Sequence, residues 1–150
     1  VNRRQQEYFI QLIRNHFGDQ LAGVTLGIWG LAFKPWTDDI REAPALSIVR
    51  QLLAAGARLR VYDPQAVTKA RQVLGEDNES LRYAADMYEA ANGAAALVIN
   101  TDWTMFRTPD LERLRAKLQR PVIFDGRNLY NPRKMREAGF QYYYIGKPES

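Results

Sequence analysis

The segment WGLAFKPWTDDIREAPAL, residues 29–46, concentrates side chains that could bind an anion or a sugar. It begins like the end of a buried strand and ends like the start of a helix, with a long loop between. The charged residues in this loop are Lys34, Asp38, Asp39, Arg41 and Glu42. An ammonium group can hydrogen bond to sugar hydroxyls and a guanidinium group can bind a phosphate, so the loop is suited to a sugar nucleotide. Arg127, in the segment DGRN (125–128), would add a second guanidinium group.

These charged residues also have purely structural interpretations. Lys34 could be one more solvated lysine, and Arg41 could pair with the acids beside it. Those acids could instead favour the N-terminus of the following helix through its dipole. Trp36, in the same polar loop, could pack on a partner domain or on a nucleotide. The sequence of the loop leaves these alternatives open.

Alternating strand and helix patterns predict the architecture that must position these residues. Short apolar runs predict strands at 24–30, 58–63, 81–83, 95–100, 121–126 and 140–145. Helical spacing predicts helices between them, such as one with Pro44 near its first turn and Gly56 just past its end. We therefore expect right-handed crossovers and a doubly wound, mostly parallel α/β sheet of about six strands, covered on both faces and preceded by one long helix.

The sequence also indicates a helix at its beginning and the starts of three later helices. The chain begins within a helical pattern whose apolar stripe consists of Phe9, Ile10, Ile13 and Phe17. A helix already under way at residue 1, without an initiating methionine, suggests a piece of a longer protein. Later helices are expected to open where a capping residue precedes a proline, at Asp63-Pro64, Thr108-Pro109 and Asn131-Pro132.

Several other residues receive structural interpretations. Asp63 lies where a dinucleotide-binding fold keeps its ribose-binding acid, but capping explains it fully, so we interpret it as a cap. Asp125 and Gly126 could likewise form only a turn. His16 stands among polar residues on the first helix, which favours a solvated side chain over a catalytic one. Trp29 and the tyrosines of the last strand are interpreted as core and edge residues.

The position of the long loop predicts a ligand site that lacks the usual dinucleotide turn. In an open parallel sheet, ligands bind beyond the carboxyl ends of the strands, near the switch in strand order. If the first strand is central, the loop after Gly30 and the segment after the fifth strand both open on this edge. However, GIWGLAFK is not G-x-G-x-x-G, and no helix begins directly after the strand. The sequence therefore implies a different nucleotide grip.

Composition narrows the class of protein. The 150 residues, 46% hydrophobic and 25% charged, are enough for one domain with a real core. A net charge of +4 mildly favours anionic ligands. The sequence has no run of basic residues interleaved with aromatic residues, so it gives little indication of nucleic-acid binding. No apolar run approaches a membrane span and no signal-like N-terminus is present, so a cytoplasmic protein without a membrane partner is expected. The sequence contains no cysteine, and neither a metal-ligand cluster nor a Ser-His-Asp set can be assembled.

Five segments together resemble one protein family. They are GLAFKPWTDDIREAP, AAGARLRVYDP, ALVINTDWTMF, VIFDGRNLY and AGFQYYYIGKP. In this order they resemble the carboxyl-terminal, UDP-binding domain of the UDP-glucose/GDP-mannose dehydrogenases, in particular the UDP-glucose 6-dehydrogenases. The resemblance covers essentially the whole chain. It implies that 1–18 is the tail of a central interdomain and dimerisation helix and that 19–150 is a Rossmann-like UDP-sugar-binding domain.

The resemblance also implies roles for single residues. In that family an amino-terminal domain binds NAD, and two hydride transfers convert UDP-glucose to UDP-glucuronate. Phe33 and Lys34 match the pair that contacts the substrate, and Arg127 matches an arginine of the substrate site. Arg41 matches an arginine that approaches the NAD pyrophosphate. The implied partners are a UDP-sugar substrate, the amino-terminal NAD-binding domain of the same protein and, at full length, a second copy in a homodimer.

Departures from the family pattern keep alternatives open. The NAD-binding glycines and the family's catalytic cysteine are absent from these residues, so the chain is expected to be inactive by itself. Trp36 stands where the family usually has a small or polar residue. The substrate could instead be GDP-mannose or UDP-N-acetylmannosamine, or the chain could be a stand-alone, non-catalytic UDP-binding module. An NAD-binding domain in its own right is disfavoured by the missing glycine turn.

Overall fold

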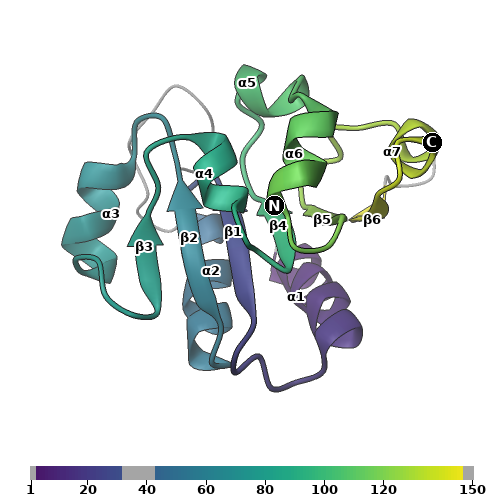
Figure 1. Ribbon diagram of the computed structural model, residues 1–150. Helices are drawn as coiled ribbons and strands as arrows, with labels where there is room; N and C mark the ends of the chain where they lie inside the picture. Colours follow the sequence, from purple (N-terminus) through teal and green to yellow (C-terminus); the bar gives the residue numbers. More distant parts are fainter. Residues whose placement is uncertain (1–2, 32–42, 147–150) are drawn as a thin grey trace.

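The computed structural model is a three-layer α/β fold (Figure 1). The structure describes residues 3–31 and 43–146. The strands are β1 (Thr25–Trp29), β2 (Arg58–Tyr62), β3 (Leu81–Tyr83), β4 (Ala96–Ile99), β5 (Val122–Asp125) and β6 (Gln141–Tyr144). The helices are α1 (Arg3–Phe17), α2 (Pro44–Ala54), α3 (Val67–Leu74), α4 (Met87–Ala91), α5 (Thr104–Arg107), α6 (Leu111–Lys117) and α7 (Pro132–Glu137). Within these described ranges, no helix has both the length and the apolar character needed to cross a membrane.

The six strands form one parallel sheet in the order β3-β2-β1-β4-β5-β6. The first strand is central, because β1 pairs with β2 on one side and with β4 on the other. After β3 the chain crosses back over β1 to start the second half of the sheet at β4. These findings confirm the expected doubly wound parallel sheet and its central first strand. They place the switch in strand order at the carboxyl ends of β1 and β4.

The two faces of the sheet are covered by different helices. Leu26 and Ile28 of β1 point to the face covered by α1, α2 and α3, whereas Trp29 belongs to the core under α4, α5, α6 and α7. Figure 1 shows α1 and α2 behind the sheet and α4 and α6 in front of it. Trp29 is fully buried, as predicted, and its indole N–H donates a hydrogen bond of 2.8 Å to the carbonyl oxygen of Met87. Within the described residues, helices therefore pack on both faces of the sheet, and the carboxyl ends of the strands are where a fold of this type binds its ligand.

The first helix packs on the sheet through the predicted stripe. Phe9, Ile10 and Ile13 are buried, and Phe17 is partly buried against the same cluster. Helical periodicity explains this face, because residues three and four positions apart lie on one side of a helix. The stripe joins α1 to the core that α2 and the sheet share.

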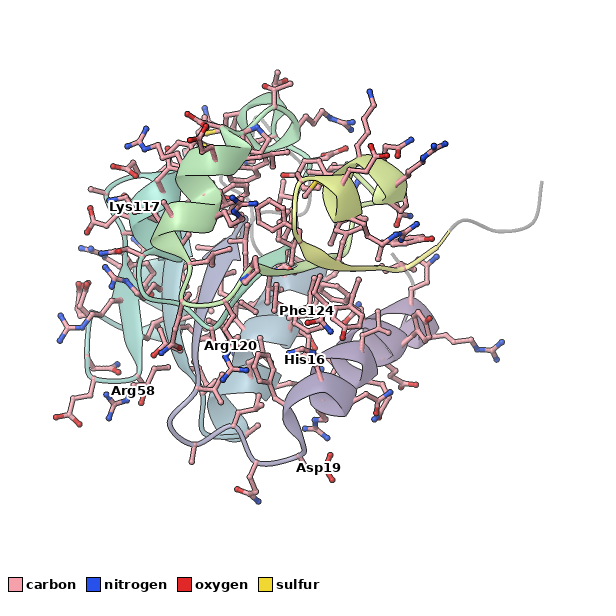
Figure 2. All side chains as sticks on the ribbon, turned by 45° about the vertical axis from the view of Figure 1, so that its right-hand side comes forward. His16, Asp19, Arg58, Lys117, Arg120 and Phe124 are labelled. Carbon is pink, nitrogen blue, oxygen red and sulfur yellow. The ribbon has the colours of Figure 1, made fainter. Side chains whose placement is uncertain are left out.

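The prediction of a solvated His16 is wrong. His16 is half-buried, and its ring contacts Phe17, Phe124 and Tyr143 edge-on, at centroid distances of 4.6, 5.7 and 5.5 Å. Figure 2 shows it between α1 and the sheet beside Phe124. Its Nδ1 lies 2.9 Å from the Tyr143 hydroxyl. Burial, and secondarily the charge of Arg120, lower the pKa of His16 below 6.5. The polar neighbours in sequence lie on other sides of the helix, which is why the pattern misled.

Of the three predicted cap-and-proline helix starts, only Asn131-Pro132 is fully confirmed. The side chain of Asn131 accepts a hydrogen bond from the Lys134 N–H, and Pro132 is the first residue of α7. After Asp63 the chain makes a turn, and α3 begins only at Val67. Thr108 instead ends the short helix α5, which the sequence did not predict.

The cap of α6 is Asp110. Its carboxylate accepts a hydrogen bond of 3.0 Å from the Arg113 N–H, and α6 begins at the next residue, Leu111. The prediction chose Thr108 because it precedes a proline. The competing signal was an aspartate two residues later, whose charge also favours a helix N-terminus.

Candidate functional site

Buried polar side chains gather at one edge of the sheet. Among the described residues, those that are polar or charged and buried are Asp63, Asn100, Thr101 and Asp125. Each stands at the carboxyl end of a strand or directly after it: β2 for the first, β4 for the next two and β5 for the last. Burying a polar group is unfavourable unless a partner compensates it. The edge predicted to bind ligand is thus the edge where this chain buries its polar groups.

Asp63 anchors the residue that leads into the long loop. One carboxylate oxygen accepts hydrogen bonds from the Gln65 and Ala66 N–H groups, at 2.9 and 2.8 Å. The other accepts a hydrogen bond of 2.8 Å from the N–H of Leu31. The prediction that Asp63 is a helix N-cap is therefore wrong, because α3 begins only at Val67 and its N-cap is Ala66. Asp63 instead closes the turn after β2, and its bond to Leu31 gives it a second role. Asp63 sets where the chain leaves the sheet after β1.

The carboxyl ends of β1 and β4 approach each other too closely for a side chain at Gly30. Gly30 has φ +100°, a left-handed conformation that favours glycine. A Cβ atom there would overlap the side chain of Thr101 and lie 2.9 Å from its backbone nitrogen. This glycine therefore serves the turn at the switch point, without forming a dinucleotide motif.

Asp125 organises the segment that carries Arg127. Its buried carboxylate accepts hydrogen bonds from the Arg127 N–H at 2.8 Å, from the Leu129 N–H at 2.7 Å and from the Tyr142 hydroxyl at 2.6 Å. Burial, and then the bond to this carboxylate, raise the pKa of Tyr142, which keeps its proton as the donor. Gly126 passes close to α1, where a Cβ would lie 3.2 Å from the Phe9 ring. Asp125 and Gly126 do form a turn, and the turn fixes the backbone of Arg127.

The side chain of Arg127 is held by the neighbouring strand end. Its guanidinium nitrogen lies 3.5 Å from one carboxylate oxygen of Asp102, and Arg107 reaches the same oxygen at 3.2 Å. Two guanidinium groups thus share one carboxylate oxygen, and the planar N–H donors of a guanidinium group suit an anionic ligand. About a quarter of the Arg127 side chain (26%) is exposed, so it remains accessible.

A small cavity opens to solvent beside Arg127, and the empty space within and in front of it, open solvent included, is about 270 Å³. The first turns of α1, the first turn of α2 and the ends of β4 and β5 all contribute to its walls. It is lined by Gln5, Gln6, Phe9, Pro44, Ala45, Ile48, Asn100, Gly126, Arg127 and Ile145. Polar and apolar groups thus meet at the carboxyl edge, as binding sites for small organic ligands require.

The structure describes only part of the predicted site. Arg127 stands at the carboxyl edge, as expected. Phe33, Lys34 and Arg41 lie outside the described residues, as do Trp36 and the acidic residues 38, 39 and 42. Within the described ranges, no cluster of three or more acidic or histidine side chains could hold a metal ion.

Sequence reasoning missed Asn100 and Asp102. Both follow closely on a strand that the sequence did predict, and the same topological rule that selected Arg127 could have selected them. Neither residue belongs to a charged run, so the sequence pattern alone does not single them out.

Comparison with known proteins agrees with this geometry. Residues 27–132 match the model of the UDP-glucose/GDP-mannose dehydrogenase family, UDP binding domain. The chain is 42% identical over 151 aligned positions to a UDP-glucose 6-dehydrogenase of Pseudomonas aeruginosa, covering 99% of this chain and 33% of that protein. It is 42% identical over 132 positions to a UDP-glucose 6-dehydrogenase of Rhizobium meliloti, covering 88% of this chain and 29% of that protein.

A solved structure extends the likeness to three dimensions. The UDP-glucose dehydrogenase of the archaeon Pyrobaculum islandicum superposes with a TM-score of 0.77 at 35% identity, covering 96% of this chain and 30% of that one. The chain thus spans about a third of the length of the relatives it matches. The family match covers most of the chain, and the fold and the order of its motifs agree with it. This chain belongs to the UDP-glucose/GDP-mannose dehydrogenase family and corresponds to its UDP-binding domain.

Proposed function

We propose that this chain is the carboxyl-terminal, substrate-binding domain of an NAD-dependent UDP-glucose 6-dehydrogenase, which oxidises UDP-glucose to UDP-glucuronate. The observation that carries the proposal is the carboxyl edge itself. Buried polar side chains, a cavity and Arg127 meet there, in a family whose domain is described as UDP-binding. The names of the relatives favour UDP-glucose among the possible substrates.

Arg127 binds the diphosphate in this proposal. Its backbone is tied to Asp125 and its side chain to Asp102. A guanidinium group already held near its working position loses little conformational freedom when a ligand arrives. Its planar array of N–H donors suits phosphate oxygens.

The long loop completes the site in this proposal. Phe33 and Lys34 contact the sugar, and Arg41 reaches across to the NAD pyrophosphate. The described residue that supports this is Leu31, which Asp63 directs from the end of β1 at the ligand edge. Replacing Lys34 by Ala in the whole enzyme is expected to reduce turnover strongly while the domain remains folded. Near-normal turnover would remove Lys34 from the site.

NAD belongs to another domain of the whole protein. Among the described residues, the helix that follows β1 is α2, which begins only at Pro44, so these residues do not place a helix N-terminus directly after β1 as a dinucleotide cradle requires. When bound to its own domain, NAD supplies the hydride acceptor. In this proposal residues 1–18 continue the central helix that links to that domain and contributes to a homodimer, and 19–150 bind the UDP-sugar. The expected cytoplasmic location remains a prediction.

Calorimetric titration of the chain with UDP, UDP-glucose and NAD tests the proposal. We expect UDP and UDP-glucose to bind, and Arg127→Ala to weaken both roughly tenfold, as loss of a charge-assisted hydrogen bond predicts. Arg133→Ala is the matched control, because the Arg133 side chain is 84% exposed on α7. Binding of NAD with no binding of UDP would contradict the proposal.

An activity assay on the whole enzyme tests which nucleotide sugar is the substrate. NADH release from a panel of UDP-glucose, GDP-mannose and UDP-N-acetylmannosamine is expected to be fastest with UDP-glucose. Faster release with either of the others would reassign the substrate. Absence of any release, with UDP still bound, would favour a non-catalytic UDP-binding module.

A further inference from the structure

Asn100 carries a buried side-chain amide that the described part of its own fold does not use. The residue is only 8% exposed. Neither Oδ1 nor Nδ2 has a hydrogen-bond partner within residues 3–31 and 43–146. Its backbone N–H, in contrast, is engaged, since it donates a hydrogen bond of 2.8 Å to the Trp29 carbonyl oxygen. A buried amide with both ends unpaired is unfavourable and uncommon in folded proteins, so it calls for a partner from beyond these residues.

The surroundings of Asn100 indicate where that partner would enter. Asn100 lines the cavity at the carboxyl edge, together with Arg127 and Gln6 on the polar side and Phe9 and Ile48 on the apolar side. It directly follows β4, one of the two strands at the switch in strand order. The unpaired amide and the guanidinium of Arg127 therefore border the same space.

We propose that Asn100 is a specificity-determining contact, which hydrogen bonds a neutral polar group of the nucleotide sugar in this cavity. This inference rests on the proposed function. It assigns different parts of the ligand to two residues of the cavity: Arg127 binds the charged phosphate, and Asn100 binds an uncharged part.

The chemistry of the amide favours a neutral group with both a donor and an acceptor. Oδ1 accepts and Nδ2 donates, so a phosphate would satisfy only Nδ2 and would be repelled by Oδ1. Two parts of a UDP-sugar offer the matching pair. One is a pair of sugar hydroxyls, and the other is the imide edge of uracil, where an N–H stands next to a carbonyl oxygen. Either part would satisfy both ends of the amide.

Two substitutions at Asn100 test the proposal. Asn100→Leu removes the amide at similar volume, and Asn100→Ala removes it with less bulk. Asn92→Ala is the matched control, because Asn92 is exposed at the end of α4, away from the cavity. Binding of UDP and of UDP-glucose is measured by calorimetry, and the thermal unfolding midpoint is measured without ligand.

We expect at least one Asn100 variant to fold with an unliganded midpoint no lower than that of the unmodified chain, since the amide has no partner among the described residues to lose. The same variant should bind UDP-glucose about tenfold more weakly, the effect of one lost hydrogen bond to a buried group. A loss confined to UDP-glucose assigns the contact to the hexose. An equal loss for UDP assigns it to the nucleoside.

Other outcomes overturn the inference. If both Asn100 variants bind UDP and UDP-glucose like the unmodified chain, the amide does not contact ligand, while the proposed function stands. If both variants lower the midpoint and neither weakens binding by more than Asn92→Ala does, the amide is structural. If the unmodified chain binds neither UDP nor UDP-glucose, the proposed function fails as well.

Discussion

The two edges of this sheet treat polar residues in opposite ways. At the carboxyl edge, Asp63 and Asp125 are buried and receive several hydrogen bonds each. At the amino edge, Arg58, Glu79 and Arg82 are exposed around an open pocket, whose empty space, open solvent included, is about 740 Å³. Figure 2 shows Arg58 pointing away from the ribbon into solvent. Both edges carry charged side chains, but among these residues only the carboxylates of the carboxyl edge are buried and hydrogen bonded to the backbone.

The difference shows where this domain accepts unfavourable burial. A solvated charge contributes little to stability and places no constraint on geometry. A buried carboxylate with several donors holds its neighbours in position, at the expense of its own hydration. The buried carboxylates at the carboxyl edge therefore fix the backbone around them. The charged side chains at the amino edge remain in solvent and, among the described residues, fix no neighbouring residue. Substitutions at matched positions on the two edges can sharpen this contrast.

The largest expected effect is at Asp125. Asp125→Ala would leave the Arg127 N–H, the Leu129 N–H and the Tyr142 hydroxyl without their acceptor. We expect the free energy of unfolding to fall by at least about 3 kcal/mol, because each lost bond is to a buried charged group. Arg58→Ala, at the exposed edge, should change it by less than about 0.5 kcal/mol.

Urea denaturation of both variants measures this difference. Comparable losses at Asp125 and Arg58 would contradict the contrast between the edges. Asp125→Asn, which keeps one oxygen acceptor, is expected to fall between the unmodified chain and Asp125→Ala.

A smaller effect is expected at the switch point. Gly30 and Gly75 share a left-handed backbone, with φ of +100° and +99°. Of the two, only Gly30 has neighbours within 4 Å of the position that a Cβ atom would take, the nearest being Thr101. Gly75→Ala should therefore show the backbone strain alone, about 1 kcal/mol, and Gly30→Ala should lose about 2 to 3 kcal/mol. Thermal unfolding of the pair measures the difference. Equal losses would mean that the approach of β1 to β4 does not constrain residue 30.

The smallest expected effect is a pH dependence of the free energy of unfolding that arises from His16 on α1. The folded pKa of His16 lies below its ordinary value of 6.5, so between these values the unfolded chain binds more protons. The stability that neutral His16 contributes is therefore complete above about pH 6.5 and is lost as the pH falls below it. His16→Gln should remove this part of the pH dependence of the free energy of unfolding.

Proton NMR titration of the His16 ring checks the cause directly. Its pKa should lie below 6.5, and Arg120→Gln should raise it, because the positive charge of Arg120 adds to burial in disfavouring the protonated ring. The Tyr143 hydroxyl, 2.9 Å from Nδ1, also faces the ring. A pKa above 6.5 would show that burial does not govern this histidine.

Much of the fold follows from local patterns in the sequence. The runs VTLGIWG and AALVIN predicted the buried strands β1 and β4, and the spacing of Phe9, Ile10 and Ile13 predicted the buried face of α1. The start of α6 was harder to predict than the strands. Thr108 and Asp110 both carry side chains that can cap a helix, and the local sequence does not indicate which of them is the N-cap. Topology predicted that Arg127 lies at the carboxyl edge, where the structure has it, while its role in binding stays a prediction. The unpaired amide of Asn100 could not be predicted, since its lack of partners among the described residues appears only once the strands are packed.

The most direct test of the account is an NMR titration of the isotope-labelled chain with UDP, following backbone amide shifts. We predict that the shifts that change most belong to Leu31, Asn100, Thr101, Gly126 and Arg127, all at the carboxyl edge. Amides at the amino edge, such as those of Thr25, Arg58 and Arg82, should hardly move. The largest changes at the amino edge, with the carboxyl edge unmoved, would contradict the account.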